Sequence, residues 1–264
     1  MNTKIAENLA SRERERIRVV SLLPDVCNAE KVLRTISDLA EAKIGGYVCV
    51  STVHMVMEAY DDAEFAKMVN AADVIITDGM PLVWMQRMQG AKTANRLRGN
   101  DLMIMLCEVA EKRGLKVGFY GGAQNTIDLL LKRAKADLPN LEIAYSFSPP
   151  FRDLSDEENS KIIEEIKNSG AQILFVGLGC PKQEKWMAAN KTKISAVMLG
   201  VGAAFDFYAG NLKESPEWIG NLGFEWLYRF FQEPKRLWRR YLILNPRFVW
   251  IAGLQLLGLK KFEN

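Results

Sequence analysis

Three polar side chains follow the ends of two apolar runs early in the chain. Asp78 ends the run Asp73-Val-Ile-Ile-Thr-Asp-Gly, and Thr52 and His54 end the run before it. The carboxyl ends of parallel strands meet at the rim of a ligand crevice, where a carboxylate can act as a general base. Asp78 could equally cap the helix that starts near Pro81, and His54, the single histidine, could equally be a packed residue.

Glycines break the ends of three later apolar runs. The candidate ligand-contacting glycines are Gly121, Gly122, Gly177, Gly179, Gly200 and Gly202. Glycine lets a ligand approach the backbone, and the next helix offers unpaired N–H groups to phosphate. Several such turns side by side favour a nucleotide or diphosphate ligand, although each turn alone could be a tight connection without one. None fits G-x-G-x-x-G, because Phe205 takes the third glycine position after Gly200.

Metal chemistry has little support in the sequence. Asp61-Asp62 lies in a context that favours helix capping, and Asp206 has no second carboxylate at D-x-D spacing. His, Cys and carboxylate residues form no cluster with ligand spacing. We therefore predict neither a metal ion nor a cofactor, so backbone amides and arginines must meet the charge of a leaving diphosphate.

The C-terminal segment supplies such arginines. Arg229, Arg236, Arg240 and Arg247 are spaced so that an uninterrupted helix would place them on one face, with Arg239 beside them. The planar guanidinium suits phosphate oxygens. The surrounding apolar residues form a stretch too short to span a bilayer, which favours helices lying in a membrane interface. A helical cap on the sheet, with a solvated basic face, is the alternative.

Seven apolar runs would form the sheet that positions these groups. They are Ile17–Leu23, Tyr47–Val53, Asp73–Thr77, Leu115–Tyr120, Leu141–Phe147, Gln172–Gly177 and Ile194–Leu199. Their lack of polar alternation predicts strands buried on both faces of a mainly parallel sheet. Helix signals lie between them: Ser155 opens a capping box, and Asn100-Asp101 starts a helix that Gly114 stops. The pattern predicts an α/β, doubly wound, Rossmann-like fold.

The strand pattern ends before Pro216. Three helical stretches follow, roughly residues 216–231, 234–244 and 246–258, with Pro234 and Pro246 acceptable in first turns. We therefore predict an α/β nucleotide-sugar-binding catalytic domain over residues 1–215 and a basic amphipathic helical appendage over residues 216–264.

Composition and charge exclude several classes of protein. With 264 residues, 48% of them apolar and 25% charged, the chain is neither disordered nor fibrous. Apolar runs stay shorter than the ~18 residues of a spanning helix, and the charged N-terminus does not look like a signal peptide, so we expect a cytoplasmic protein. Four isolated cysteines (Cys27, Cys49, Cys107 and Cys180) suit small reduced residues rather than disulfides or zinc ligands.

The net charge of +3 conceals an asymmetry. Residues 224–264 hold eight Lys/Arg against three acids, which leaves 27 bases and 29 acids, a balance of −2, in the first 223 residues. Aromatic residues interleave with the bases in this tail. A basic, aromatic tail on a slightly acidic body favours an anionic membrane surface as the partner, and we expect no nucleic acid.

Six co-linear motifs resemble the WecG/TagA/CpsF family of glycosyltransferases (family 26), from about residue 17 to 245. They are Val50-Ser-Thr-Val-His-Met-Val-Met57, Thr77-Asp-Gly-Met-Pro81, Gly118-Phe-Tyr-Gly-Gly122, Gly177-Leu-Gly-Cys-Pro-Lys-Gln-Glu184, Gly200-Val-Gly-Ala-Ala-Phe-Asp206 and Glu225-Trp-Leu-Tyr-Arg229. The resemblance implies a GT-E-type Rossmann-like fold with a membrane-associated appendage on the inner face of the plasma membrane. It also implies inverting transfer of an N-acetylmannosamine-type sugar from a UDP-sugar donor to a polyprenyl-diphosphate-linked sugar acceptor, in bacterial surface polysaccharide synthesis.

The resemblance also implies roles for individual residues. Asp78 matches the catalytic base, Thr52 a pocket threonine and Gln183 a functional glutamine at the donor site. The expected substrate-binding residues are His54, Lys182, Asp206, the six glycines above, and Arg229, Arg236 and Arg239, which the appendage would fold over the site. The teichoic-acid branch has asparagine at the position of His54, so acceptor binding is expected to differ here.

Two other classes of function stay open at this point. A soluble nucleotide-dependent Rossmann-type enzyme would use the glycine turns but would not need the basic tail. A non-catalytic membrane-surface adaptor would use the tail but would not need Asp78 or Gln183. A homo-oligomer is compatible with all three interpretations.

Overall fold

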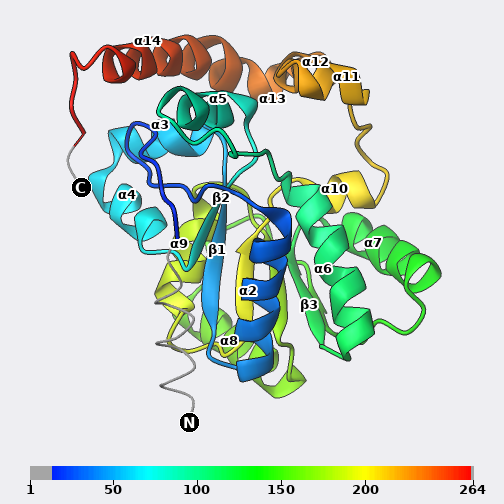
Figure 1. The fold of residues 1–264 in the computed structure, drawn as a ribbon. Helices are drawn as coiled ribbons and strands as arrows, with labels where there is room; N and C mark the ends of the chain where they lie inside the picture. Colours follow the sequence, from blue (N-terminus) through cyan, green and yellow to red (C-terminus); the bar gives the residue numbers. More distant parts are fainter. Residues whose placement is uncertain (1–13, 263–264) are drawn as a thin grey trace.

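The computed structural model describes residues 14–262 and contains a six-stranded sheet in which every pairing is parallel (Figure 1). The strands are β1 (Gly46–Ser51), β2 (Val74–Thr77), β3 (Val117–Gly121), β4 (Ile143–Phe147), β5 (Ile173–Gly177) and β6 (Val197–Gly200). They lie in the order β2-β1-β6-β5-β3-β4. Because the strands are parallel, their carboxyl ends lie at one edge of the sheet.

Helices cover both faces of this sheet, which confirms the α/β, doubly wound prediction. Along β1, Val48 and Val50 point into one buried cluster and Tyr47 and Cys49 into the other. The first cluster is covered by α2 (Ala29–Ala42), α6 (Gly99–Arg113), α7 (Gln124–Asp137) and α10 (Ala204–Tyr208). The second is covered by α3 (Val53–Asp61), α4 (Ala63–Asn70), α5 (Met80–Met88), α8 (Asp156–Ser169) and α9 (Lys182–Asn190).

The predicted strand at Ile17–Leu23 is wrong. This segment makes a tight turn, with mutual backbone hydrogen bonds between Val19 and Leu22, and Val20 adopts a positive φ of 56°. Val19, Val20 and Leu22 are nevertheless fully buried, and the N–H of Val20 donates to Gln255 Oε1. An apolar run therefore indicated burial correctly, but burial alone does not distinguish a strand from a buried turn.

Local helix signals were confirmed at one predicted start and corrected at another. Ser155 forms the complete capping box of α8, and Gly170 ends that helix. The α6 helix begins at Gly99, after Arg98, instead of at the Asn100-Asp101 pair, although Gly114 ends it in a left-handed conformation as predicted.

The C-terminal helices lie across the carboxyl-end edge of the sheet (Figure 1). The first predicted stretch is split into α11 (Glu217–Asn221) and α12 (Glu225–Gln232) at Gly223, whose φ is +76°. The other two merge, because α13 (Pro234–Trp238), a π-helical turn η1 (Arg239–Leu244) and α14 (Asn245–Leu256) follow one another directly. The wide π turn lies immediately before Pro246, where the missing N–H interrupts α-helical bonding.

The last helix is anchored in the body of the protein. Phe248, Ile251 and Ala252 of α14 are buried in the cluster that also contains side chains of α3 and α5. Within the part of the chain that the structure describes, no helix has the length and apolar character needed to cross a bilayer. Cys27, Cys49 and Cys107 are buried free thiols and Cys180 is a partly buried one, as predicted. The charged segment at residues 1–13, on which the targeting prediction depends, lies outside the described residues.

Candidate active site

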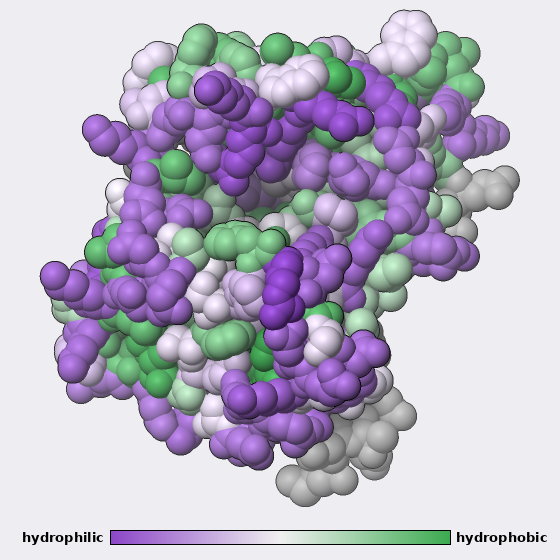
Figure 2. Space-filling view, turned by 180° about the vertical axis from the view of Figure 1, so that it is seen from behind, coloured by the Kyte–Doolittle hydropathy of each residue, from purple (hydrophilic) through white to green (hydrophobic). Residues whose placement is uncertain are grey.

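A cavity of about 930 Å³ lies between the carboxyl ends of the strands and the C-terminal helices. It appears as a hollow in the face shown in Figure 2, with hydrophilic side chains along its upper rim. Its walls come from the ends of β1, β2, β5 and β6, from the loop before α6, and from α12, α13 and η1. The topology thus brings together the polar groups that the sequence placed at strand ends.

Asp78 lies in this cavity directly after β2, and its carboxylate is held from two sides. Its Oδ2 accepts a hydrogen bond from the N–H of Gly99 at 3.2 Å, and its Oδ1 lies 3.2 Å from a terminal nitrogen of Arg96. The side chain stays 23% exposed. The alternative role as a helix cap is wrong, because Gly79 is the N-cap of α5 and no side chain bonds there.

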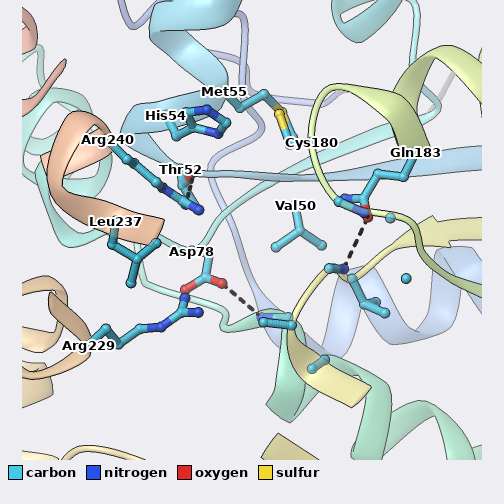
Figure 3. Close-up of a pocket in the computed structure, with 18 of the residues that line it drawn as sticks. Val50, Thr52, His54, Met55, Asp78, Cys180, Gln183, Arg229, Leu237 and Arg240 are labelled. Atoms are coloured by element: carbon cyan, nitrogen blue, oxygen red, sulfur yellow. Dashed lines mark hydrogen bonds between the residues drawn. The ribbon is translucent and has the colours of Figure 1, made fainter. Parts of the chain in front are cut away.

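Thr52 and His54 lie on the same rim, at the start of α3. Thr52 Oγ1 accepts a hydrogen bond from Arg240 of η1 at 3.2 Å, and Figure 3 shows Asp78, Thr52, Arg229 and Arg240 directed toward the same space. His54 Nε2 lies 3.2 Å from Glu58 Oε1. Burial, and secondarily the charge of Arg240, lowers the pKa of His54 to about 4. His54 is therefore a neutral imidazole at pH 7.

Gln183 connects two of the glycine turns. Its Oε1 accepts hydrogen bonds from the N–H groups of Gly179 at 3.1 Å and Gly202 at 3.2 Å, and its Nε2 donates to Glu184. The N–H of Gly122 is likewise bonded, to the carbonyl of Gly177. These three amides are therefore already occupied. Of the backbone amides and arginines expected to meet the charge of a diphosphate, these amides are therefore not free, and the arginines must supply more of the donors.

The predicted glycines fall into two groups. A Cβ on Gly121 would lie 2.5 Å from the backbone of Gly177, and one on Gly177 would lie 2.7 Å from the Phe205 ring. Packing therefore requires glycine at these positions, and at Gly200, where a Cβ would meet Met187 and Gln183. Gly179 and Gly202 instead have positive φ beside open space on the cavity wall. Gly122, the sixth predicted glycine, has a φ of +71°, and a Cβ there would lie 3.3 Å from the Phe205 ring, so only Gly179 and Gly202 have room for an approaching ligand.

Two further predicted residues lie in different surroundings. Asp206 lines the cavity, where its Oδ1 accepts a hydrogen bond from Thr126 Oγ1 at 2.9 Å. Lys182, the exposed first residue of α9, is not among the residues that line the cavity. Its ammonium lies 3.3 Å from Asp153. The placement of Lys182 therefore gives no support to its predicted contact with substrate.

Six arginines line the cavity, and half of them carry uncompensated charge. Arg98 pairs with Asp101 and Glu214, Arg236 with Glu233, and Arg247 with Asp61. Within residues 14–262, the other three, Arg229, Arg239 and Arg240, form no ion pair. Arg229 stacks over the Phe207 ring, and burial lowers the pKa of Arg240. This arrangement leaves three positive charges for an anionic ligand. Arg236, which was expected to bind substrate, is paired with Glu233 instead.

Several cavity residues were missed by the sequence analysis. Arg96, Asn100, Glu214 and Glu225 lie at the site or on its wall, and Phe151 lines it with a side chain that is 90% exposed. Arg96 and Glu225 form a 2.5 Å ion pair across 129 positions of sequence. The adjacent Arg96-Leu-Arg98-Gly99 segment, with two arginines before a helix-starting glycine, is the signal that could have found two of the site residues.

Glu184, beneath the site, is a buried carboxyl that pairs with no cation among residues 14–262. Burial raises its pKa to about 7, against the smaller opposing effect of hydrogen bonds from Gln183, its own backbone and Cys180. A carboxyl whose folded pKa is raised binds its proton more tightly in the folded state. The stability of the fold should therefore decrease as the pH rises from the ordinary glutamate value of 4.5 to about 7.

We expect Glu184→Gln to remove this dependence, because a neutral amide can still accept the hydrogen bond from Gln183. The variant should gain about 3 kcal/mol over the wild type between pH 5 and pH 8, from a shift of roughly 2.5 pKa units. Urea denaturation at both pH values measures the difference. Glu164→Gln, which alters an exposed pair with Lys167, is the control. An equal stability difference at the two pH values would contradict the assignment.

Comparisons of the sequence with known proteins point to one family. A family model described as glycosyl transferase WecG/TagA/CpsF family matches residues 17–262. A protein from Bacillus spizizenii is 30% identical over 206 residues, which cover 78% of this chain and 77% of that protein. One from Bacillus subtilis is 28% identical over 209 residues, or 79% of each chain. Both carry the name N-acetylglucosaminyldiphosphoundecaprenol N-acetyl-beta-D-mannosaminyltransferase.

Proposed function

The chain belongs to the WecG/TagA/CpsF family of glycosyltransferases, and on that premise we propose that it moves an N-acetylmannosamine-type hexosyl group from a UDP-sugar to a polyprenyl-diphosphate-linked sugar. The names of the two Bacillus relatives support this donor sugar and this acceptor class. The observation that carries the proposal is the position of Asp78, a carboxylate in a large cavity at the strand ends, facing three unpaired arginines. The family assignment favours the transferase over the soluble Rossmann-type enzyme and the membrane-surface adaptor.

The reaction is a direct displacement at the anomeric carbon, with inversion. Asp78 accepts the proton of the acceptor hydroxyl as the new glycosidic bond forms and the bond from the anomeric carbon to the UDP oxygen breaks. Arg229, Arg239 and Arg240 stabilise the negative charge that develops on the diphosphate. Gln183 keeps the turns at Gly179 and Gly202 in place, and Asp206 accepts hydrogen bonds from donor hydroxyl groups. Independence from a metal ion stays a prediction.

The direct test is a transfer assay with purified protein. UDP-N-acetylmannosamine and a short-chain polyprenyl diphosphate N-acetylglucosamine are incubated with the full chain, and the disaccharide lipid is detected by mass spectrometry. NMR of the new anomeric centre reports inversion. Parallel reactions with UDP-N-acetylglucosamine and UDP-glucose define the donor. Failure to form a glycolipid from any UDP-hexose would refute the proposal.

We further propose that the C-terminal helices bind the cytoplasmic membrane surface, in the manner of a GT-E-type appendage. Their outer side exposes large apolar residues, and Figure 2 shows hydrophobic side chains along the edge where these helices lie. These residues are Trp218, Phe231, Trp238, Leu242, Val249, Trp250 and Leu257. Tryptophan among basic residues favours the interface of an anionic bilayer. A membrane-bound protein would meet its lipid-linked acceptor at the same surface.

Replacing the exposed tryptophans by charge should separate membrane binding from folding. Trp238 and Trp250 are 51% and 69% exposed, so Trp238→Glu and Trp250→Glu leave the core intact. Each should weaken liposome binding by about tenfold or more, because a large apolar side chain contributes about 1.5–3 kcal/mol on burial. Cosedimentation with anionic vesicles measures this, with the α7 variant Leu129→Glu as control. Unchanged binding in both variants would exclude this surface.

Substitution is a sharper experiment than truncation. Removal of residues 234–264 would also remove Phe248, Ile251 and Ala252, which cover apolar side chains of α3 and α5. A truncated chain would therefore expose part of its core, and loss of activity would not separate membrane binding from folding. The division at residue 215 into a catalytic domain and an appendage stays a prediction.

A further inference from the structure

Glu225 is an acidic residue among the arginines of the C-terminal helices, and it points inward. It is the first residue of α12, and its side chain is only 20% exposed. Its Oε2 lies 2.5 Å from a terminal nitrogen of Arg96, whose side chain is 17% exposed. This pair joins a C-terminal helix to the loop that precedes α6. It is therefore a contact of the helical layer with the strand-end rim.

Arg96 also holds Asp78. Its Nε donates to the backbone carbonyl of Asp78, and the nitrogen that contacts Glu225 lies 3.2 Å from Asp78 Oδ1. One guanidinium nitrogen is thus shared between two carboxylates, and the shorter contact is the one to Glu225. The N–H of Gly99 binds the other oxygen of Asp78. These contacts hold the Asp78 carboxylate in one orientation, but Asp78 shares the positive charge of Arg96 with Glu225.

The sharing has a consequence for proton transfer. A guanidinium that belonged to Asp78 alone would stabilise the ionised carboxylate and make it a weaker base. A second carboxylate beside the same guanidinium opposes that effect. We propose that Glu225 is a positioning residue that, by sharing Arg96, sets the basicity of Asp78 in the transfer reaction. The inference rests on the proposed function, because it requires Asp78 to be the base.

The other charged or titratable groups around Asp78 come from every element that packs against it. They include His54 of α3, Arg98 before α6, Arg229 of α12, and Arg240 and Tyr241 of η1, in addition to Arg96 and Glu225. Arg98 is neutralised by Asp101 and Glu214, and His54 is uncharged near pH 7. These groups stay in place when Glu225 or Arg96 is substituted. A change in the pH dependence can therefore be assigned to the substituted pair.

Because α12 carries Glu225, the basicity of Asp78 depends on the seating of this helix. The same helix carries Arg229 into the cavity. As it is seated in the structure, α12 thus places both Arg229 and Glu225 at the cavity.

Opposite substitutions in the pair test the inference. The acid limb of the kcat/KM profile for transfer reports ionisation of the base. Glu225→Gln removes a negative charge, so Arg96 then pairs with Asp78 alone. The acid limb should therefore move to lower pH by about 0.5–1 unit. The plateau rate should also fall, because the base is weaker. Arg96→Gln removes the cation and leaves two carboxylates together, so the limb should move to higher pH by about 1 unit.

Glu64→Gln is the control for these pH profiles. It alters an exposed pair with Lys67 and should leave the profile unchanged. Shifts in the same direction, or lower rates with unshifted limbs, would show a structural role and overturn the inference. If Glu225→Gln does not fold, Glu225→Asp is the second variant, because it keeps the charge but shortens the side chain. Its acid limb should show a smaller shift to lower pH. An unshifted profile in this variant overturns the inference. Full activity of Asp78→Asn would instead overturn the base assignment itself.

Discussion

Replacement of Asp78 by asparagine should lower kcat for glycosyl transfer by about 10²–10⁴-fold, the usual contribution of a positioned general base. Asparagine has nearly the same shape, and its amide oxygen can still accept a hydrogen bond from Gly99 or Arg96. The binding of the donor should therefore change little, because only the proton acceptor is lost. A fall in kcat at nearly constant KM is the pattern of an interaction made in the transition state.

Initial rates at saturating UDP-sugar and lipid acceptor measure this effect, and circular dichroism checks the fold of the variant. Asp128→Asn, on the exposed side of α7, makes the same chemical change outside the cavity and should be fully active. Near-normal kcat in a folded Asp78→Asn protein would remove Asp78 from the role of base. The acceptor hydroxyl would then have to be activated by another group on the rim.

The sheet could be predicted from the sequence because each strand is a short apolar run between helix signals. Six of the seven predicted runs overlap strands, and the strand-end rule correctly placed Thr52 and Asp78 on the same rim. The error at Ile17–Leu23 arose because a turn can bury the same side chains as a strand. Tertiary packing determines the conformation of that segment, and the local hydrophobic pattern alone does not reveal it.

At the start of α6, the contact with Asp78 overrides the capping preference of the local sequence. Asn100 and Asp101 have the composition of a helix cap, yet the helix begins at Gly99, whose N–H points to the carboxylate of Asp78. A Cβ at Gly99 would lie 3.2 Å from Val50 and 3.8 Å from Asp78 Oδ2. The glycine therefore lets the first turn of this helix come close to the proposed base.

The charge network around Asp78 could not be predicted from spacing. Arg96 and Glu225 are 129 positions apart in the sequence, and only the fold of α12 over the strand ends brings them together. The helical period did predict that several tail arginines share a face. It could not predict that Arg247 is neutralised, because its partner Asp61 lies 186 positions earlier, in α3. The pairing of Arg236 with Glu233, three positions before it, was within reach of helical spacing. Sequence thus identified the candidate cations, and the structure identified those with free charge.

Replacement of Arg240 by glutamine should lower kcat/KM by about 10²–10³-fold, the range found when one charge-stabilising donor is removed from a site. Arg240 is the most enclosed of the three unpaired arginines, and it bonds Thr52 beside Asp78. Glutamine removes the charge, and its amide nitrogen ends where Arg240 Nε lies, so the bond from the terminal nitrogen to Thr52 is lost as well. Arg240→Lys keeps the charge without the planar fork and should lose less activity. Rates with both variants, at the same donor and acceptor concentrations, separate charge from geometry.

The same substitution should stabilise the protein when no ligand is bound. Burial of an unpaired cation is unfavourable, as the lowered pKa of Arg240 indicates, and a neutral side chain avoids that cost. A bound diphosphate offsets the cost in the wild type. Arg240→Gln should therefore melt at a higher temperature than the wild type without ligand and gain less from added UDP. Arg34→Gln, at an exposed pair with Glu30, is the control for thermal melting. If Arg240→Gln responds to UDP as the wild type does, Arg240 does not contact the diphosphate, and the charge it carries must serve the acceptor instead.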